Sequence, residues 1–227
     1  MLIEIPRVLS ATELLAVNRL VTSEAMVDGR VSAGELAAKA KQNLQLPETS
    51  AAAKSAGEII LQALGRNTLF NSAALPLRVL PPLFNRYDAG MSFSTHVDGA
   101  VRMVPGAGIR MRADLSSTLF LTPPDDYDGG ELVIEDSYGT HSVKLAAGHM
   151  ILYPAGSLHR VNEVTRGTRW SSVFWSQSMI KDDGLRTLLH DLDRGIMDVR
   201  KSLGTDTPGT LTLTGVYHNL LRRAGEL

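Results

Sequence analysis

The chain has 227 residues, of which 44% are hydrophobic and 21% charged, and 23 Lys and Arg against 24 Asp and Glu give a formal net charge of −1. This composition is typical of globular proteins and excludes disordered and fibrous ones, and the near-neutral charge offers no basic field for nucleic acid or an anionic membrane. Cysteine is absent, which excludes disulfides, thiol catalysis and Cys-ligated metals. Any bound metal must therefore be held by histidines and carboxylates.

Residues 1–77 are expected to be mostly helical. Ser10 to Glu13 reads as a capping box at a helix start, and Ser32 to Glu35 repeats that pattern. A third helix is predicted from Ser50 to Leu64, with Gly65 as its stop. The chain lacks the cationic start of a signal peptide and any apolar run long enough to span a membrane, so we expect a soluble, cytoplasmic protein.

Residues 78–178 have a different texture, with short alternating and β-branched runs separated by turn signals. This pattern predicts an all-β sandwich or small barrel. The expected strands are 79–87, 91–97, 115–121, 131–135, 141–146, 149–153 and 169–177.

Residues 179–227 return to a helical pattern. One helix is predicted from the leucines between Leu185 and Ile196, and a last one over 215–223. The leucine stripe suits either core packing or contact between copies, so homo-oligomer formation is a further expectation. The whole chain is thus predicted to be a mixed α/β (α+β) protein in three parts, with a β-rich domain between helical regions.

The most informative motif is His96-Val97-Asp98. Residues two apart on a strand share a face, so this spacing directs an imidazole and a carboxylate to one point. His159 follows much later, just after a turn, and Arg169 comes ten residues after it. This order of residues is typical of the site formed by two histidines and one carboxylate in non-haem Fe(II) oxygenases.

The residue types suit that chemistry. Two neutral imidazoles and one carboxylate, from His96, His159 and Asp98, would occupy one face of an octahedral Fe(II) and leave positions for a 2-oxo acid and dioxygen. A second anionic end on the co-substrate would need a cation at some distance from the metal. Arg169 fits this role, because a guanidinium pairs with a carboxylate through two parallel bonds and stays charged when desolvated.

Further segments resemble the bacterial PKHD-type hydroxylases, which are Fe(II)- and 2-oxoglutarate-dependent dioxygenases of the prolyl 4-hydroxylase-like group. The resemblance extends over nearly the whole chain. It is carried by residues 28–30, 41–46, 85–87, 96–98, 114–121, 127–132, 164–169 and 213–221.

The resemblance implies a double-stranded β-helix (jelly roll) with iron at His96, Asp98 and His159 and 2-oxoglutarate on Arg169. It also implies L-ascorbate as an auxiliary reductant and an association with bacterial iron uptake. The implied reaction hydroxylates a small-molecule or peptide substrate with O2, while 2-oxoglutarate is split to succinate and CO2. The identity of the substrate does not follow from the resemblance.

Two residues are secondary candidates for contact with 2-oxoglutarate. Related dioxygenases often place a tyrosine near the position of Tyr87, although this residue would equally serve as an aromatic of the barrel wall. Ser171 follows Arg169 by two positions and would share its face of the strand, or would simply make room there. Trp175 lies on the same face and is predicted to be a packing residue.

Residues 101–112 contain arginines and no acidic residue. Arg102 and Arg110 are candidates for attracting an acidic substrate if this segment is a lid. The alternative is a solvated loop between strands.

Two other functional classes compete with the oxygenase. A cupin-like metal enzyme would use the metal without 2-oxoglutarate, but that chemistry gives Arg169 no role. A jelly-roll sensor of iron or of a small acid would need no open coordination positions, although it could retain them.

Overall fold

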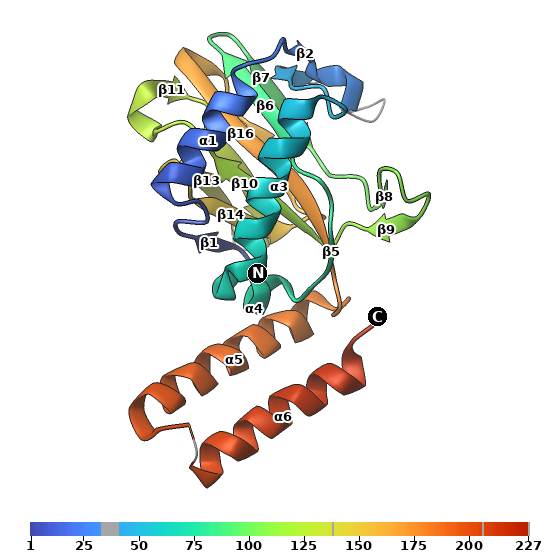
Figure 1. Cartoon of the computed structure of the whole chain (residues 1–227), viewed down its shortest axis with the longest axis vertical. Coiled ribbons are helices and arrows are strands. Elements are labelled where there is room, and N and C mark those ends of the chain that lie inside the picture. The colour runs from blue at the N-terminus through green and yellow to red at the C-terminus, as the bar shows by residue number, and fades with distance from the viewer. Residues whose placement is uncertain (33–40, 138, 206, 227) are drawn as a thin grey trace.

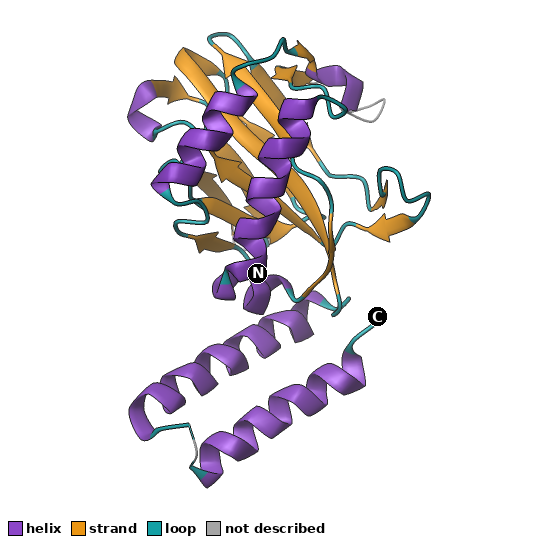
Figure 2. Cartoon of the chain, in the orientation of Figure 1, coloured by secondary structure: helices purple, strands orange, loops and turns teal. Residues whose placement is uncertain are grey.

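The computed structural model describes residues 1–32, 41–137, 139–205 and 207–226. Two antiparallel sheets lie face to face as a jelly roll, with helices against the larger sheet and a helical hairpin at one end (Figures 1 and 2). The predicted mixed α/β fold with a jelly-roll core is thus confirmed.

The larger sheet is built around the long strand β16. Its strands follow the order β1 (Ile3–Ile5), β14 (Met150–Pro154), β10 (Leu115–Phe120), β16 (Val164–Ser178), β6 (Leu83–Asp88), β4 (Leu44–Gln45) and β2 (Val27–Asp28). Two further strands pair with β16, namely β5 (Pro76–Val79) and β11 (Tyr127–Gly129).

The smaller sheet follows the order β13 (Gly139–Val143), β12 (Leu132–Asp136), β15 (Leu158–Val161), β7 (Ser92–His96) and β3 (Lys41–Gln42). A separate hairpin is formed by β8 (Val101–Met103) and β9 (Arg110–Arg112), which project from the side of the barrel (Figure 1). The two ends of the arginine-rich segment 101–112 pair with each other, so this segment is a β-hairpin and not an irregular loop.

Side chains alternate between the two faces of the larger sheet, as the strand period requires. Leu119 and Leu152 pack outward against helices α1 (Ala11–Val21) and α3 (Ala51–Arg66). Their neighbours Phe120 and Tyr153 belong instead to the cluster between the sheets, which includes Ile134 of β12. The larger sheet therefore separates two apolar cores, and the inner one surrounds the open end of the barrel where polar residues gather.

The N-terminal helices begin where the sequence predicts them. Ser10 forms both bonds of the expected capping box with Glu13, and Ser50 caps α3. Gly65 is not the stop, however, because α3 continues to Arg66 and α4 (Thr68–Ala74) starts directly afterwards. Asn67 makes this junction, since its side chain accepts from the Phe70 N–H at 2.8 Å and opens the next helix.

The first 77 residues also supply strands β1 to β4 to both sheets, in addition to the expected helices. These strands have two or three residues each, too few to show a period in the sequence. The expected strand 79–87 is divided into β5 and β6 around Pro81-Pro82, where no backbone N–H can donate. The helix predicted after Ser32 lies largely outside the described residues.

The C-terminal region is a hairpin of α5 (Asp183–Leu203) and α6 (Pro208–Ala224). Helix α6 begins earlier than the predicted range 215–223, because Thr207 caps it. Leu189 of α5 and Tyr217 and Leu220 of α6 pack with Leu75 below the barrel. Among the described residues, no helix combines the length and the apolar character needed to cross a bilayer.

Candidate active site

A cavity of about 600 Å³ opens between the two sheets. Val97 and Val101 line it and are 49% and 61% exposed, so they mark the place where it reaches the surface. Its lining contains all but one of the residues singled out from the sequence, namely Tyr87, His96, Asp98, Arg102, His159, Arg169 and Ser171. The exception is Arg110.

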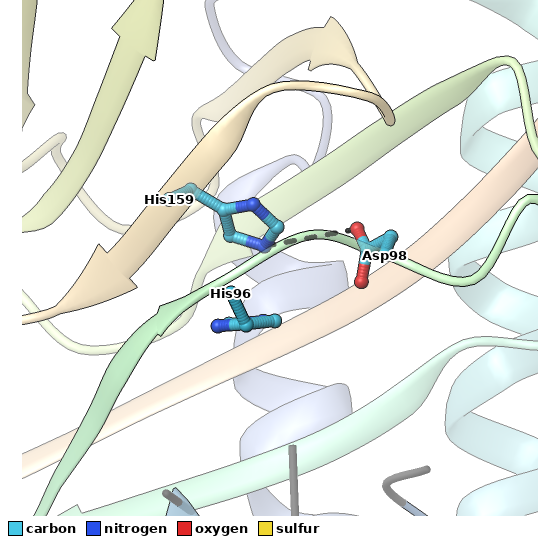
Figure 3. Close-up of side chains that lie close together, drawn as sticks. All are labelled: His96, Asp98 and His159. Carbon is cyan, nitrogen blue, oxygen red and sulfur yellow. Dashed lines mark ion pairs between the residues drawn. The ribbon is translucent and has the colours of Figure 1, made fainter. Parts of the chain in front are cut away.

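His96, Asp98 and His159 meet on the smaller sheet (Figure 3). His96 ends β7 and is paired in register with His159 of β15, which places the two imidazoles side by side. Asp98 follows two residues after His96. One ligand atom of each residue lies within 4.8 Å of the others, and His159 Nε2 is 3.7 Å from Asp98 Oδ2.

Backbone carbonyls orient both imidazoles in the same way. His96 Nδ1 lies 2.8 Å from the carbonyl oxygen of Ser94, and His159 Nδ1 lies 3.0 Å from that of Ser157. A carbonyl can only accept, so Nδ1 of each ring carries the proton and Nε2 keeps its lone pair. The hydroxyl of Ser116 donates to Asp98 Oδ2 at 2.6 Å and fixes the carboxylate. These are the supporting contacts that orient metal ligands in proteins.

The surroundings keep His96 neutral. Burial, and then the neighbouring His159, lower the pKa of His96 from 6.5 to about 4. The ring of Phe93 stacks on the imidazole with centroids 3.7 Å apart. His96 therefore offers an uncharged nitrogen near neutral pH, which is the form that binds a metal ion.

Arg169 is 1% exposed and lies on β16, on the opposite wall of the cavity. One terminal nitrogen donates to Ser171 Oγ at 2.8 Å, whereas Nε and the other terminal nitrogen have no hydrogen-bond partner among the described residues. Asp98 is the sole carboxylate among the described residues that line the cavity. A buried guanidinium with unused donors costs free energy, and a carboxylate in the cavity would satisfy it.

Tyr87 is paired in register with Arg169 and is 2% exposed. The Arg169 guanidinium carbon lies 5.3 Å from the ring centroids of Tyr87 and Phe120, so the cation lies between aromatic groups. Burial raises the pKa of Tyr87 to about 12, and the phenol therefore stays neutral. Tyr87 and Ser171 both line the cavity next to Arg169.

The arginines of the β8–β9 hairpin differ in position. Arg102 lines the cavity, with its guanidinium 3.4 Å from the Trp175 ring centroid. Arg110 is exposed on β9 and does not line the cavity. Arg112 pairs with Asp114 at 2.6 Å and fastens the hairpin to the barrel.

Sequence reasoning missed two residues of the site. Ser116 lies in β10, where three successive hydroxyl residues are fully buried, and buried hydroxyls need partners. That run of polar residues in an apolar strand was an available signal. Lys41 is a buried cation in the cavity wall, and nothing in its local sequence distinguishes it from a surface lysine.

The donor set fits a divalent cation with an open coordination sphere. Two imidazole nitrogens and one carboxylate oxygen are the ligands typical of non-haem iron, and three protein ligands leave positions of an octahedral ion open to other ligands. Arg169 across the cavity fits the carboxylate of a bound acid. The arrangement can therefore hold a metal ion and an organic anion together.

Comparisons with known proteins identify the family of the chain. Residues 82–177 match the 2OG-Fe(II) oxygenase superfamily, and residues 183–226 match the PKHD-type hydroxylase C-terminal domain. A PKHD-type hydroxylase of Methylobacterium nodulans is 62% identical over 227 residues, and one of Cupriavidus metallidurans is 62% identical over 228, each match covering 100% of both chains.

Among solved structures, a prolyl-4-hydroxylase of Pseudomonas putida aligns with a TM-score of 0.52 and 18% identity, over 78% of this chain and 92% of that one. This likeness supports the jelly-roll fold. Identity over the full length of the relatives establishes the family, and with it Fe(II) and 2-oxoglutarate as cofactor and co-substrate. The chain belongs to the PKHD-type hydroxylases and is an Fe(II)- and 2-oxoglutarate-dependent dioxygenase.

Proposed function

We propose that this dioxygenase hydroxylates a small molecule or a peptide, with His96, Asp98 and His159 as the iron ligands and Arg169 as the anchor of 2-oxoglutarate. The observation that supports these roles is the placement of three ligand atoms within 4.8 Å on one wall and a buried, partly unpaired guanidinium on the other. Bound iron supplies the redox chemistry that couples cleavage of 2-oxoglutarate to succinate and CO2 with insertion of oxygen into a C–H bond.

The protein's own groups bind and orient in this proposal. The carbonyls of Ser94 and Ser157 hold Nε2 of each imidazole toward the metal position, and Ser116 holds the carboxylate of Asp98. Each of these contacts is made before any ligand arrives, so the ligand set is preorganised.

Arg169 would bind the distal carboxylate of 2-oxoglutarate through its two unpaired nitrogens, while Ser171 fixes the third. Tyr87 remains a phenol and can donate to the same anion. The apolar rings around Arg169 exclude water, which strengthens a charge-assisted hydrogen bond.

The roles are tested with anaerobic protein containing Fe(II). Addition of 2-oxoglutarate is expected to give a weak visible charge-transfer band, and oxygen is expected to start succinate formation. His96→Ala and Asp98→Ala should lose both signals, whereas His141→Ala, which changes an exposed histidine of the same sheet outside the cavity, should keep both. Undiminished succinate formation in either ligand variant would contradict the assignment.

Two finer parts of the proposal come with the family resemblance. L-ascorbate is proposed to sustain turnover by keeping iron reduced, and the reaction is proposed to serve iron uptake or homeostasis. Removal of ascorbate should shorten the burst of succinate formation without changing its initial rate. Equal initial and final rates of succinate formation without ascorbate would contradict the role of ascorbate.

The proposed role in iron uptake or homeostasis is tested by growth. A strain lacking the gene should differ in growth from its parent under iron limitation, and equal growth would contradict this role.

A further inference from the structure

Two further cations, Arg102 and Lys41, line the cavity besides Arg169. Arg169 and Trp175 share one face of β16 and are six residues apart, which corresponds to about 20 Å at the usual rise of a strand. Trp175 is paired in register with Ser116, the residue that holds Asp98. Arg102 stands over Trp175 and therefore lies at the end of the cavity where Ser116 holds Asp98.

Arg102 forms no ion pair within 4 Å with a carboxylate of the described residues, although Asp98 and Glu48 act on its charge from a greater distance. Its guanidinium carbon lies over the indole of Trp175, at 3.4 Å from the ring centroid. Burial lowers the pKa of Arg102, since the group is partly removed from water. Arg112 on the partner strand, by contrast, forms ion pairs with Asp114 and Glu226. Arg102 is thus a desolvated cation held in place by an aromatic ring.

Lys41 brings a second positive charge to the same cavity. It is 6% exposed on β3, its Nζ lies 5.6 Å from the ring centroid of Phe93, and it donates to Gln45 Oε1 at 3.2 Å. Burial and then the charge of Arg102 lower the pKa of Lys41 to about 8. The two cations therefore act on each other, and an anion bound between them would stabilise both.

Charge balance separates this group from the co-substrate anchor. With iron and 2-oxoglutarate bound, the charges of Fe(II) and Arg169 equal those of Asp98 and the two carboxylates of 2-oxoglutarate. Arg102 and Lys41 add two positive charges, and the other carboxylates that act on them, Glu48 and Asp28, do not line the cavity. Between the two cationic ends, Val173 and Leu83 present an apolar wall.

We propose that Arg102 and Lys41 form a subsite for a carboxylate of the substrate, with Trp175 as the platform that orients Arg102. This inference rests on the proposed function and names the substrate class as a carboxylic acid with an apolar body. The N–H groups of a guanidinium lie at its planar edge, and this edge matches the two oxygens of a carboxylate. The carboxylate belongs either to a free acid or to an acidic side chain of a peptide.

Trp175 supplies a direct readout of binding. The chain contains two tryptophans, and Trp170 does not line the cavity, so the Trp170→Phe variant reports on Trp175 alone. This variant, loaded with Fe(II) and 2-oxoglutarate without oxygen, is titrated with α-amino acids, dicarboxylic acids and arylalkanoic acids, each beside its primary amide. Blocked tripeptides with central Glu or Gln and inorganic phosphate complete the panel.

At least one carboxylate is expected to change the Trp175 fluorescence saturably and to bind at least tenfold more tightly than its amide. A free acid or the Glu tripeptide as the best ligand identifies the source of the carboxylate. The inference is overturned if no carboxylate exceeds its amide, or if phosphate binds more tightly than every carboxylate.

Variants assign the binding to the two cations. Equilibrium dialysis of the best acid is expected to show at least tenfold weaker binding to R102Q and to K41Q, and unchanged binding to R110Q, which removes an exposed arginine of the same hairpin. Equal affinity of R102Q and the parent would overturn the inference.

A further variant keeps this test separate from the proposed function. R169Q should lose 2-oxoglutarate binding and still bind the acid, because Arg102 stands over Trp175, six residues along the strand from Arg169. If the parent protein binds neither iron nor 2-oxoglutarate, the proposed function fails, while the fluorescence titration without them still tests the carboxylate subsite.

Discussion

The imidazoles of His96 and His159 face each other across a register pair of neighbouring strands, with ring centroids 4.2 Å apart and planes inclined by 51°. Each ring is held from behind by a backbone carbonyl two residues earlier in the chain. Strand pairing and local backbone geometry together therefore direct both Nε2 atoms to one point, and Asp98 completes the set from the loop that follows.

Ser116→Ala is expected to weaken metal binding without abolishing it. The hydroxyl donates to Asp98 Oδ2, and loss of such an outer contact typically lowers metal affinity about 10–100-fold. Anaerobic calorimetry with Mn(II) measures the change. Ser172→Ala is the matched control, because Ser172 is equally buried in the same sheet, its hydroxyl has no hydrogen-bond partner among the described residues, and it does not line the cavity. Equal affinities of the two variants would show that Ser116 does not support the metal site.

Arg169→Gln is expected to separate co-substrate binding from metal binding. The affinity for 2-oxoglutarate should fall at least about 100-fold, since a charge-assisted pair contributes several times the free energy of a neutral hydrogen bond. Mn(II) affinity should remain within about twofold. Equilibrium dialysis of labelled 2-oxoglutarate measures the first quantity and calorimetry the second. Parallel loss of both affinities would instead assign Arg169 a structural role.

Gly130→Ala is expected to displace the side chain of Arg169, because the added methyl group would contact it. Gly130 has φ +66°, and an added Cβ would lie 3.0 Å from Arg169 Cδ and 2.9 Å from Val164 Cγ2. We expect a loss of about 1–3 kcal/mol in the free energy of unfolding and weaker 2-oxoglutarate binding. Gly90→Ala carries similar backbone strain at φ +86° with no atom near its Cβ, so it measures the strain alone. If Gly90→Ala lowers 2-oxoglutarate affinity as much, the contact with Arg169 is not the cause.

Acid binding at the Lys41 subsite should weaken as the pH rises through about 8. The pKa of Lys41 lies near 8 instead of 10.5, so its positive charge is present below this pH and lost above it. The charged groups that act on the pKa of Lys41 are Arg102, which lowers it, and Glu48, Asp28 and Asp98, which raise it. The carboxylate probes stay ionised over the whole pH range. Fluorescence titrations of the Trp170→Phe variant between pH 6 and about 10 measure the effect.

The matched control for this pH dependence is Lys41→Met in the same background. Its affinity for the acid should be lower than that of the parent at pH 6 and should change little as the pH rises. A pH dependence of equal size in Lys41→Met would show that another group is responsible.

Much of the site followed from the sequence because its residues sit at spacings that local geometry dictates. His96 and Asp98 are two residues apart, and Arg169 and Ser171 share a strand face, so each pair is positioned by a few residues of backbone. Capping residues likewise marked the starts of α1 and α3, since a cap is satisfied within its own turn.

Tertiary structure alone decided which distant residues join these pairs. The register between β7 and β15 brings His159 to His96, the pairing of β10 with β16 places Ser116 beside the cavity, and β3 buries Lys41 in its wall. The short strands of the N-terminal region and the contact of Arg102 with Trp175 were likewise decided by tertiary structure alone. Such contacts depend on the closure of the sheets around one cavity, and no local pattern of residue types encodes the partner that a strand edge or a buried charge will meet.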